Sequence, residues 1–459
     1  MKDITIKLAA IAKDEAAYLP EWIFHHLEFG FDEIEIYINN TSDNSLKILD
    51  KIVNRLPVKY RVVDELYNKS SRDFQFAAYK QLAIEAKTNG FDYVMFLDID
   101  EFWTPSDFKS SIQDLVAKLN FPQAICLQWA MHCDEEKEFS VCHRDSLKVL
   151  KHTHVKTLFR TSAPWEKISA HNILGENISY ILANGSSYIF PPEESDRAKL
   201  ARSVETYKFC YVLHRAYRSE KEYISLLGRG RPSTTGIKSN RFGYYSENAT
   251  KIVLEYPSER VADHKRRYIE FIDSFELCHD IGTAKEFVDS RYNQVLAMIQ
   301  SAKEKDYTTI LRVLKGVKLE EVVRLRTELD EKVFLNNYVE SNIRRASPHS
   351  LLALFYKWSG NKKRYDSMRV RLALKQASER DDFVKPSNLK SILHKNGVSP
   401  KSVTNVFRDL ATEHLKEFKL ISSEAYAREA LVMRPNGVYI AKLVKKIESR
   451  KNLLKRVTD

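Results

Sequence analysis

The chain has 459 residues, 43% of them hydrophobic and 11% aromatic, and this composition excludes a disordered or collagen-like protein. The 13 glycines are few for this length and form neither a dinucleotide-binding fingerprint nor a P-loop. No apolar signal core or membrane-spanning run is found, and five scattered cysteines indicate free thiols. We therefore expect a cytoplasmic protein.

Strand and helix patterns alternate through the first hundred residues. This alternation predicts a largely parallel, Rossmann-like sheet with helices on its faces, an α/β domain. The expected strands are 4–12, 34–38 and 58–63, and the expected helices are 18–27, 46–56 and 74–87.

The most informative stretch runs from Tyr93 to Trp103, where an apolar run leads into Asp98, Asp100 and Glu101. The run predicts a buried strand. Because alternate residues of a strand share a face, Asp98 and Asp100 are expected to point the same way at its carboxyl end. Two such carboxylates suit a hard divalent cation, which in turn binds phosphate oxygens.

Several segments, in the same order, resemble nucleotide-sugar glycosyltransferases of the GT-A fold, most closely those of families 2 and 92. The acidic stretch is similar to the Asp-x-Asp-Glu-Phe motif of these families, although Lys13 replaces their usual Arg and Ile38 replaces a frequent Asp. The resemblance covers about residues 1–240. The other segments that carry it are Lys13–Glu15, Glu21–Trp22, His25–His26, Asn40–Asp43, Leu213–Ser219 and Gly228–Arg231.

The resemblance implies an inverting glycosyltransferase that uses a nucleotide-diphosphate sugar together with Mn²⁺ or Mg²⁺. It implies Asp98, Asp100 and His214 as metal ligands, with Asp100 binding the cation directly and Asp98 reaching the ribose or a water ligand. It implies a glycan or lipid-linked acceptor, for example in surface polysaccharide or lipopolysaccharide synthesis. The residues expected to bind the donor are Lys13, Glu15, Asn40, Asp43 and Asp98.

The general base is expected between residues 121 and 200. Its task requires a carboxylate within hydrogen-bond reach of the acceptor hydroxyl. By order along the chain Glu166 is the first candidate, and Asp134 and Glu135 are the next. Cysteines and histidines between 132 and 154 offer a zinc site as an alternative, but their spacing fits no common zinc finger.

Charged helices dominate after residue 245. We expect a GT-A domain at 1–245, a helical extension at 246–345 and a basic, tetratricopeptide-like domain at 346–459, with repeat-like helices at 351–362 and 425–435. From Ser347 onward 24 Lys and Arg oppose 11 Asp and Glu, a surplus of 13 within a net charge of +11. This one-sided charge predicts peripheral contact with an anionic membrane at its inner face.

Two other functions remain open from the sequence. A haloacid-dehalogenase-like phosphatase also places Asp-x-Asp at a strand end, although that motif normally opens its domain. A non-catalytic membrane or nucleic-acid binder could be built on the basic tail, but no signature of specific nucleic-acid recognition is present.

Overall fold

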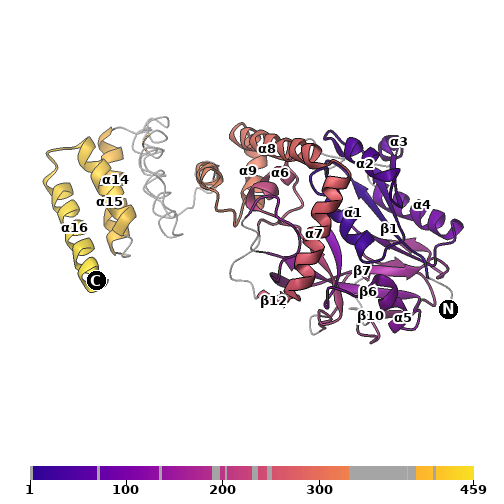
Figure 1. The fold of residues 1–459 in the computed structure, drawn as a ribbon. Helices are drawn as coiled ribbons and strands as arrows, with labels where there is room; N and C mark the ends of the chain where they lie inside the picture. Colours follow the sequence, from indigo (N-terminus) through magenta and orange to yellow (C-terminus); the bar gives the residue numbers. More distant parts are fainter. Residues whose placement is uncertain are drawn as a thin grey trace. The chain divides into compact units, whose positions relative to one another are not determined.

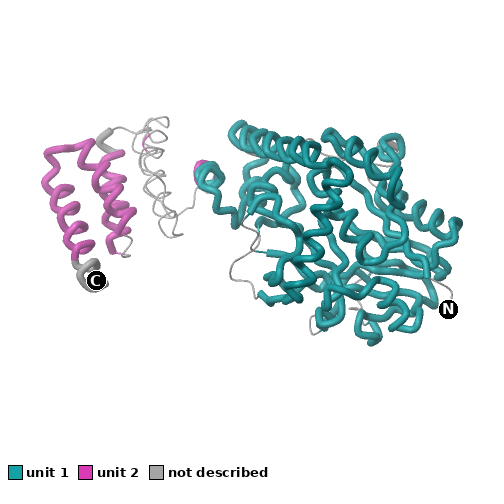
Figure 2. Tube along the Cα trace, viewed as in Figure 1, with its two compact units in different colours: residues 1–326 teal, residues 327–459 magenta. Residues whose placement is uncertain are grey.

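The computed structural model describes residues 4–69, 73–133, 137–188, 197–201, 204–229, 236–244, 251–329, 390, 400–416 and 420–458. The chain divides into two compact units, Met1–Arg326 and Thr327–Asp459 (Figures 1 and 2). The three domains expected from the sequence, with limits near 245 and 345, stay predictions.

A mixed ten-stranded sheet forms the centre of the first unit, in the order β3-β2-β1-β4-β7-β6-β11-β5, with β10 paired to β6 and β12 to β7. The half from β3 to β4 is parallel, and β7 runs antiparallel to both β4 and β6. Its strands are β1 (Ile6–Ala12), β2 (Glu33–Ile38), β3 (Val58–Val62), β4 (Tyr93–Phe96), β5 (Glu101–Pro105), β6 (Ala124–His132), β7 (Ser146–Arg160), β10 (Tyr180–Leu182), β11 (Cys210–His214) and β12 (Lys251–Glu255). A separate hairpin joins β8 (Lys167–Ile168) to β9 (Ile173–Leu174).

Helices accompany this sheet, as the alternation predicted. In the first unit they are α1 (Leu19–Glu28), α2 (Ser45–Val53), α3 (Asp64–Lys69), α4 (Phe74–Thr88), α5 (Ile112–Lys118), α6 (Glu220–Leu227), α7 (Ser258–Ser274), α8 (Cys278–Gln300) and α9 (Glu304–Val313). The expected α/β class, with a helical C-terminal region, is therefore confirmed.

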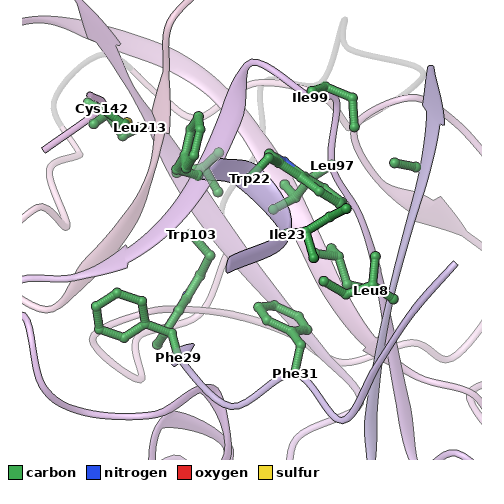
Figure 3. Packing of buried hydrophobic residues seen from close by; sticks show 14 of the residues in the cluster. Leu8, Trp22, Ile23, Phe29, Phe31, Leu97, Ile99, Trp103, Cys142 and Leu213 are labelled. Atoms are coloured by element: carbon green, nitrogen blue, oxygen red, sulfur yellow. The ribbon is translucent and has the colours of Figure 1, made fainter. Parts of the chain in front are cut away.

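Two hydrophobic clusters form the core of the first unit. Figure 3 shows part of one of them, where Trp22 and Ile23 of α1 lie near Leu8 of β1 and Leu97. Trp103 of β5 lies beside Phe29, with their ring centroids 6.1 Å apart. Apart from the ion-paired Lys7, β1 and β4 are apolar and buried, so the sheet core positions the polar turns that follow them.

The second unit, where it is described, consists of α14 (Pro400–Lys416), α15 (Leu420–Met433) and α16 (Val438–Thr458). They share a core that includes Phe407, Tyr426 and Ile447. The expected repeat helix at 425–435 lies within α15 up to Met433. The one at 351–362 lies outside the described residues, so the tetratricopeptide-like interpretation stays a prediction. No helix in the described parts of either unit is both long and apolar enough to span a membrane.

Candidate active site

The acidic stretch does not form one strand. The strand β4 ends at Phe96, and Asp98 and Asp100 lie in a turn before the chain re-enters the sheet as β5, antiparallel to β11. The Glu101 N–H donates to the Asp98 carbonyl at 2.9 Å and so closes this turn. The prediction that both carboxylates share a strand face was therefore wrong, because the turn, not the strand pleat, sets their directions.

Asp100 faces His214. The register of β5 and β11 places His214 opposite Glu101, and its Nε2 lies 3.5 Å from Asp100 Oδ2. The Arg215 N–H donates to the Asp100 carbonyl at 2.7 Å and fixes the backbone on this side. Burial raises the pKa of Asp100, but His214, Arg218 and Arg241 outweigh it and hold that pKa well below its usual range. Asp100 is therefore an ionised carboxylate in a positive field.

Asp98 turns instead toward Lys156, a side chain on β7 that is 1% exposed. The Lys156 ammonium lies 3.3 Å from Asp98 Oδ2 and 3.0 Å from Glu101 Oε2. The same Glu101 oxygen accepts a hydrogen bond from the Asp98 N–H at 2.8 Å. Burial raises the pKa of Glu101 to about 7 although Lys156 opposes this shift. Burial lowers the pKa of Lys156, but the two carboxylates more than reverse that effect.

Only two of the three expected metal ligands therefore approach one another. Among the described residues, no group of three or more His, Cys, Asp and Glu is placed to hold a metal ion, and this includes the histidines and cysteines considered for zinc. The Asp100–His214 pair nevertheless fits a Mg²⁺- or Mn²⁺-like cation, because such ions are commonly bound through one or two protein ligands plus water and substrate phosphates. Asp98 instead forms an ion pair with Lys156, and its side chain is 43% exposed.

Cations surround the adjoining turn after β1. Glu15 is buried between two arginines: it accepts from Arg218 at 3.0 Å and forms an ion pair with Arg229. The Arg218 guanidinium also lies 3.4 Å from the centre of the Tyr18 ring. Arg229 contacts the Lys13 carbonyl at 3.2 Å. Glu15 thus orients arginines and does not itself point to a ligand.

Two further cations lie within electrostatic range of Asp100. Arg241 contributes to its low pKa, and Asp100 in turn acts on Lys238. Burial, together with Arg229 and Arg241, lowers the pKa of Lys238 to about 7. The Arg241 Nε is buried without a hydrogen-bond partner among the described residues. These side chains form a positive region beside the metal-binding pair, and the sequence did not single them out.

Asn40 and Asp43, expected to bind the donor, form the turn after β2. Asn40 has a positive φ of 44°, and its N–H donates to Asp64 Oδ1 at 2.6 Å. Asp43 accepts from the backbone N–H groups of Ala16 at 2.8 Å and Ser45 at 3.0 Å. Its side chain therefore joins the turns after β1 and β2, and any effect on a ligand acts through them.

Of the expected general bases, only Glu166 lies within the described residues. Glu166 is exposed at the start of the β8–β9 hairpin, where its N–H donates to the Leu174 carbonyl at 2.8 Å. None of its described contacts involves Asp98, Asp100 or His214. Asp134 and Glu135 lie outside the described residues.

A cluster of aromatic rings lies on the other side of His214. The Trp129 ring centroid is 4.3 Å from that of His214 and 5.0 Å from that of His171. His152 and His154 of β7 complete the group. From the sequence, His152 and His154 were considered only as zinc ligands. Trp129 was not predicted as a site residue; it lies on β6, the strand paired with β7 and β11.

The α/β fold and this site agree with the expectation of a glycosyltransferase. The model of glycosyltransferase family 92 matches residues 2–208, and this match supports the expected class of enzyme. No curated protein matches the chain.

Three solved structures show distant similarity. A cytidylyltransferase from Leptospira borgpetersenii is 12% identical with a TM-score of 0.19, and the match covers 35% of this chain and 62% of that one, less than two thirds of its length. Residues 1–349 of S. aureus TarS are 10% identical with a TM-score of 0.24, covering 83% and 93%. The same fragment in complex with UDP is 13% identical with a TM-score of 0.23, covering 75% and 92%. Identities and scores this low support no conclusion about function.

Proposed function

We propose that this protein transfers a sugar from a nucleotide-diphosphate donor to a glycan or lipid-linked acceptor with inversion at the anomeric carbon, as a metal-dependent enzyme. The observation that carries the proposal is the placement of Asp100 and His214 beside the positive region of Lys238 and Arg241. A paired carboxylate and imidazole suit a divalent cation, and neighbouring Lys and Arg side chains suit a diphosphate.

Each side chain has a distinct part in this proposal. Asp100 and His214 hold Mn²⁺ or Mg²⁺, which when bound supplies charge neutralisation for the diphosphate leaving group. Lys238 and Arg241 bind the diphosphate oxygens directly. Asp98, half exposed and oriented by Lys156, faces the ribose or a water molecule.

The turns after β1 and β2 bind the nucleotide through Lys13, while Glu15, Asn40 and Asp43 hold these turns in place. Glu166 remains our first candidate to take the proton from the acceptor hydroxyl, with Asp134 as the alternative. The acceptor belongs to surface polysaccharide or lipopolysaccharide synthesis, and the exposed lysines of α16 bring the enzyme to an anionic membrane at the cytoplasmic face.

A panel of nucleotide sugars tests the donor site. UDP-glucose, UDP-galactose, UDP-N-acetylglucosamine and GDP-mannose are each added with Mn²⁺, and thermal stabilisation and slow donor hydrolysis are measured. A ligand at about a hundred times its Kd stabilises the fold by about 2.7 kcal/mol. We expect this stabilisation and the hydrolysis to disappear in Asp100→Asn and to weaken in His214→Ala.

Asp306→Asn is the matched control, because Asp306 is exposed on α9 of the same unit. Turnover that persists in the double variant Asp98→Asn, Asp100→Asn would contradict the proposal. Metal-dependent release of phosphate from p-nitrophenyl phosphate, without any nucleotide-sugar hydrolysis, would favour the phosphatase instead.

A further inference from the structure

Five aromatic side chains form a continuous group that begins at the metal-binding pair. Trp129 of β6 stands at its centre, with ring centroids 4.3 Å from His214, 5.0 Å from His171, 5.3 Å from His154 and 5.4 Å from His152. His154 also lies 4.7 Å from His152 and 4.9 Å from His171. Three parts of the fold therefore supply one surface: the central strands β6 and β7, the end of β11 and the β8–β9 turn.

Four of these rings reach solvent. His214 is buried, whereas Trp129, His152, His154 and His171 are half-buried. A structural aromatic core would be fully buried, but these four side chains are partly accessible to solvent. Lys199 lies at the edge of the group, since it forms a β-bridge with His154 and acts electrostatically on His152. Burial lowers the pKa of both His152 and His171 to about 4, so these imidazoles are neutral at pH 7.

The hydrogen bonds of two imidazoles determine which nitrogen carries the proton. His171 Nδ1 lies 3.0 Å from the Val155 carbonyl, which can only accept, so the proton is on Nδ1 and Nε2 is an acceptor. His152 Nδ1 accepts from the His154 N–H at 3.3 Å and faces His154 Nδ1 at 3.1 Å, so its own proton lies on Nε2. The group thus offers an acceptor on His171 and a donor on His152.

A surface that combines an indole with an acceptor and a donor on neutral imidazoles suits a saccharide. A sugar ring has apolar C–H faces that pack on aromatic rings, and hydroxyls that both donate and accept hydrogen bonds. The rings of this group include no Lys or Arg side chain that would favour an anionic ligand.

We propose that Trp129, His152 and His171 form the subsite for the acceptor saccharide. Its position agrees with that role, since His214 contacts both Trp129 and Asp100. A sugar ring on Trp129 therefore lies next to the site proposed for the donor diphosphate. This inference rests on the proposed function, but the binding of a glycoside to the subsite can be measured without catalysis.

Saturation-transfer NMR tests the binding with four methyl glycosides, of glucose, galactose, mannose and N-acetylglucosamine, with and without UDP and Mn²⁺. Trp129→Leu removes the indole and keeps an apolar side chain. His171→Asn retains a donor to the Val155 carbonyl and removes the Nε2 acceptor. Trp165→Phe is the control, because Trp165 packs against the second hydrophobic cluster of the unit.

We expect at least one glycoside to bind the wild-type protein, with affinity about tenfold lower in Trp129→Leu and about three- to tenfold lower in His171→Asn. Trp165→Phe should bind the glycoside and hydrolyse the donor as the wild type does. Absence of any glycoside signal, or equal signals in all four proteins, would overturn the subsite. Absence of donor hydrolysis with intact glycoside binding would instead count against the proposed function alone.

Discussion

Lys156 shows how one side chain changes the interpretation of the acidic stretch. Its ammonium is nearly inaccessible to solvent and is shared by Asp98 and Glu101. Replacing one partner of a buried pair typically costs about 3–5 kcal/mol, because the remaining charge stays buried and unpaired. We expect Lys156→Met to lower the free energy of unfolding by about 3 kcal/mol. This value is the lower end of that range, because Glu101 has a pKa of about 7 and can become neutral by taking up a proton.

The double variant Lys156→Met, Glu101→Gln removes both charges and should recover most of this loss. Urea denaturation of the two variants and of Glu101→Gln alone measures the coupling. If the double variant is as unstable as Lys156→Met, then Lys156 stabilises the fold through packing and not through its charge.

The sequence predicted the parts of the site that lie in recognisable segments. Asp100 and His214 were expected to meet, and they do, because both flank neighbouring strands of the sheet. The partner of Asp98 was not predictable, since Lys156 is 58 residues away and its direction depends on how β7 crosses between β4 and β6. Trp129 was missed for the same reason: nothing local brings it beside histidines from three other segments.

At the scale of secondary structure, a capping box on α6 positions the buried arginine beside the site. The Ser219 hydroxyl donates to the Glu222 carboxylate at 2.6 Å and accepts from its N–H at 3.3 Å. Arg218 immediately precedes it with a positive φ of 50°, so the cap and the arginine are geometrically linked. Loss of an N-cap typically costs about 1 kcal/mol.

We therefore expect Ser219→Ala to lose about 1 kcal/mol of stability and also to reduce donor hydrolysis, because Arg218 shifts from Glu15. Ser111→Ala is the control: Ser111 forms the same capping box with Asp114 on α5. Chemical denaturation should give similar losses for both variants. Equal hydrolysis in the two would show that the cap on α6 is purely structural.

The packing of α1 against β5 makes stability depend on pH. His25 and His26 of α1, together with His143 and His264, form a buried cluster of rings around Phe102 and Phe108. Burial holds the pKa of His25 and His143 well below the usual range and lowers that of His26 to about 3 and of His264 to about 4. These histidines are neutral in the folded protein.

The histidines of the unfolded chain take up protons near pH 6.5, whereas the buried histidines of the folded chain do not. The free energy of unfolding is therefore highest above pH 6.5 and falls as the pH drops toward 4. At pH 5.5 each of these histidines should lower it by about 1.4 kcal/mol. Urea denaturation at pH 7.5 and 5.5 measures the loss. His264→Phe should reduce this loss of unfolding free energy by about the contribution of one histidine. His279→Gln, at an exposed position, should leave the loss unchanged.

The order of strands could be anticipated only in part. The parallel half, from β3 to β4, follows from the alternation of strand and helix patterns over the first hundred residues. The antiparallel half could not be foreseen, because β12 lies about a hundred residues after β7 in the sequence and pairs with its first part. Long-range pairing of this kind leaves no local signal, and residues 251–255 were predicted to belong to the helical extension at 246–345.

For the whole molecule, the positive charge is concentrated in the C-terminal part of the chain. The surplus of 13 positive charges lies after Ser347, and Lys442, Lys445 and Lys446 are exposed on α16. Other basic residues of this helix have protein partners, since Lys451 pairs with Glu424 and Arg450 donates to the Leu415 carbonyl at 3.1 Å. The three exposed lysines are therefore the part of α16 best suited to an anionic surface.

Each basic side chain near an anionic membrane contributes about 1 kcal/mol, and the attraction decays within a Debye length. We expect the protein to bind vesicles that contain phosphatidylserine at low salt and to release them at about 0.5 M salt, where the Debye length is only several ångströms. Vesicle sedimentation measures both. Replacing Lys442, Lys445 and Lys446 by Glu should weaken binding, whereas replacing Lys87, Lys305 and Lys315, exposed in the first unit, should not.

A chain that ends at Arg345 separates this attraction from catalysis. It keeps all of the first unit, including every residue assigned to the site, and lacks the basic helices. We expect it to hydrolyse the donor slowly and to remain in the supernatant with the same vesicles. If it sediments as well as the full chain does, the positive charge of the second unit serves a protein partner or the unit's own stability, and the membrane attaches elsewhere.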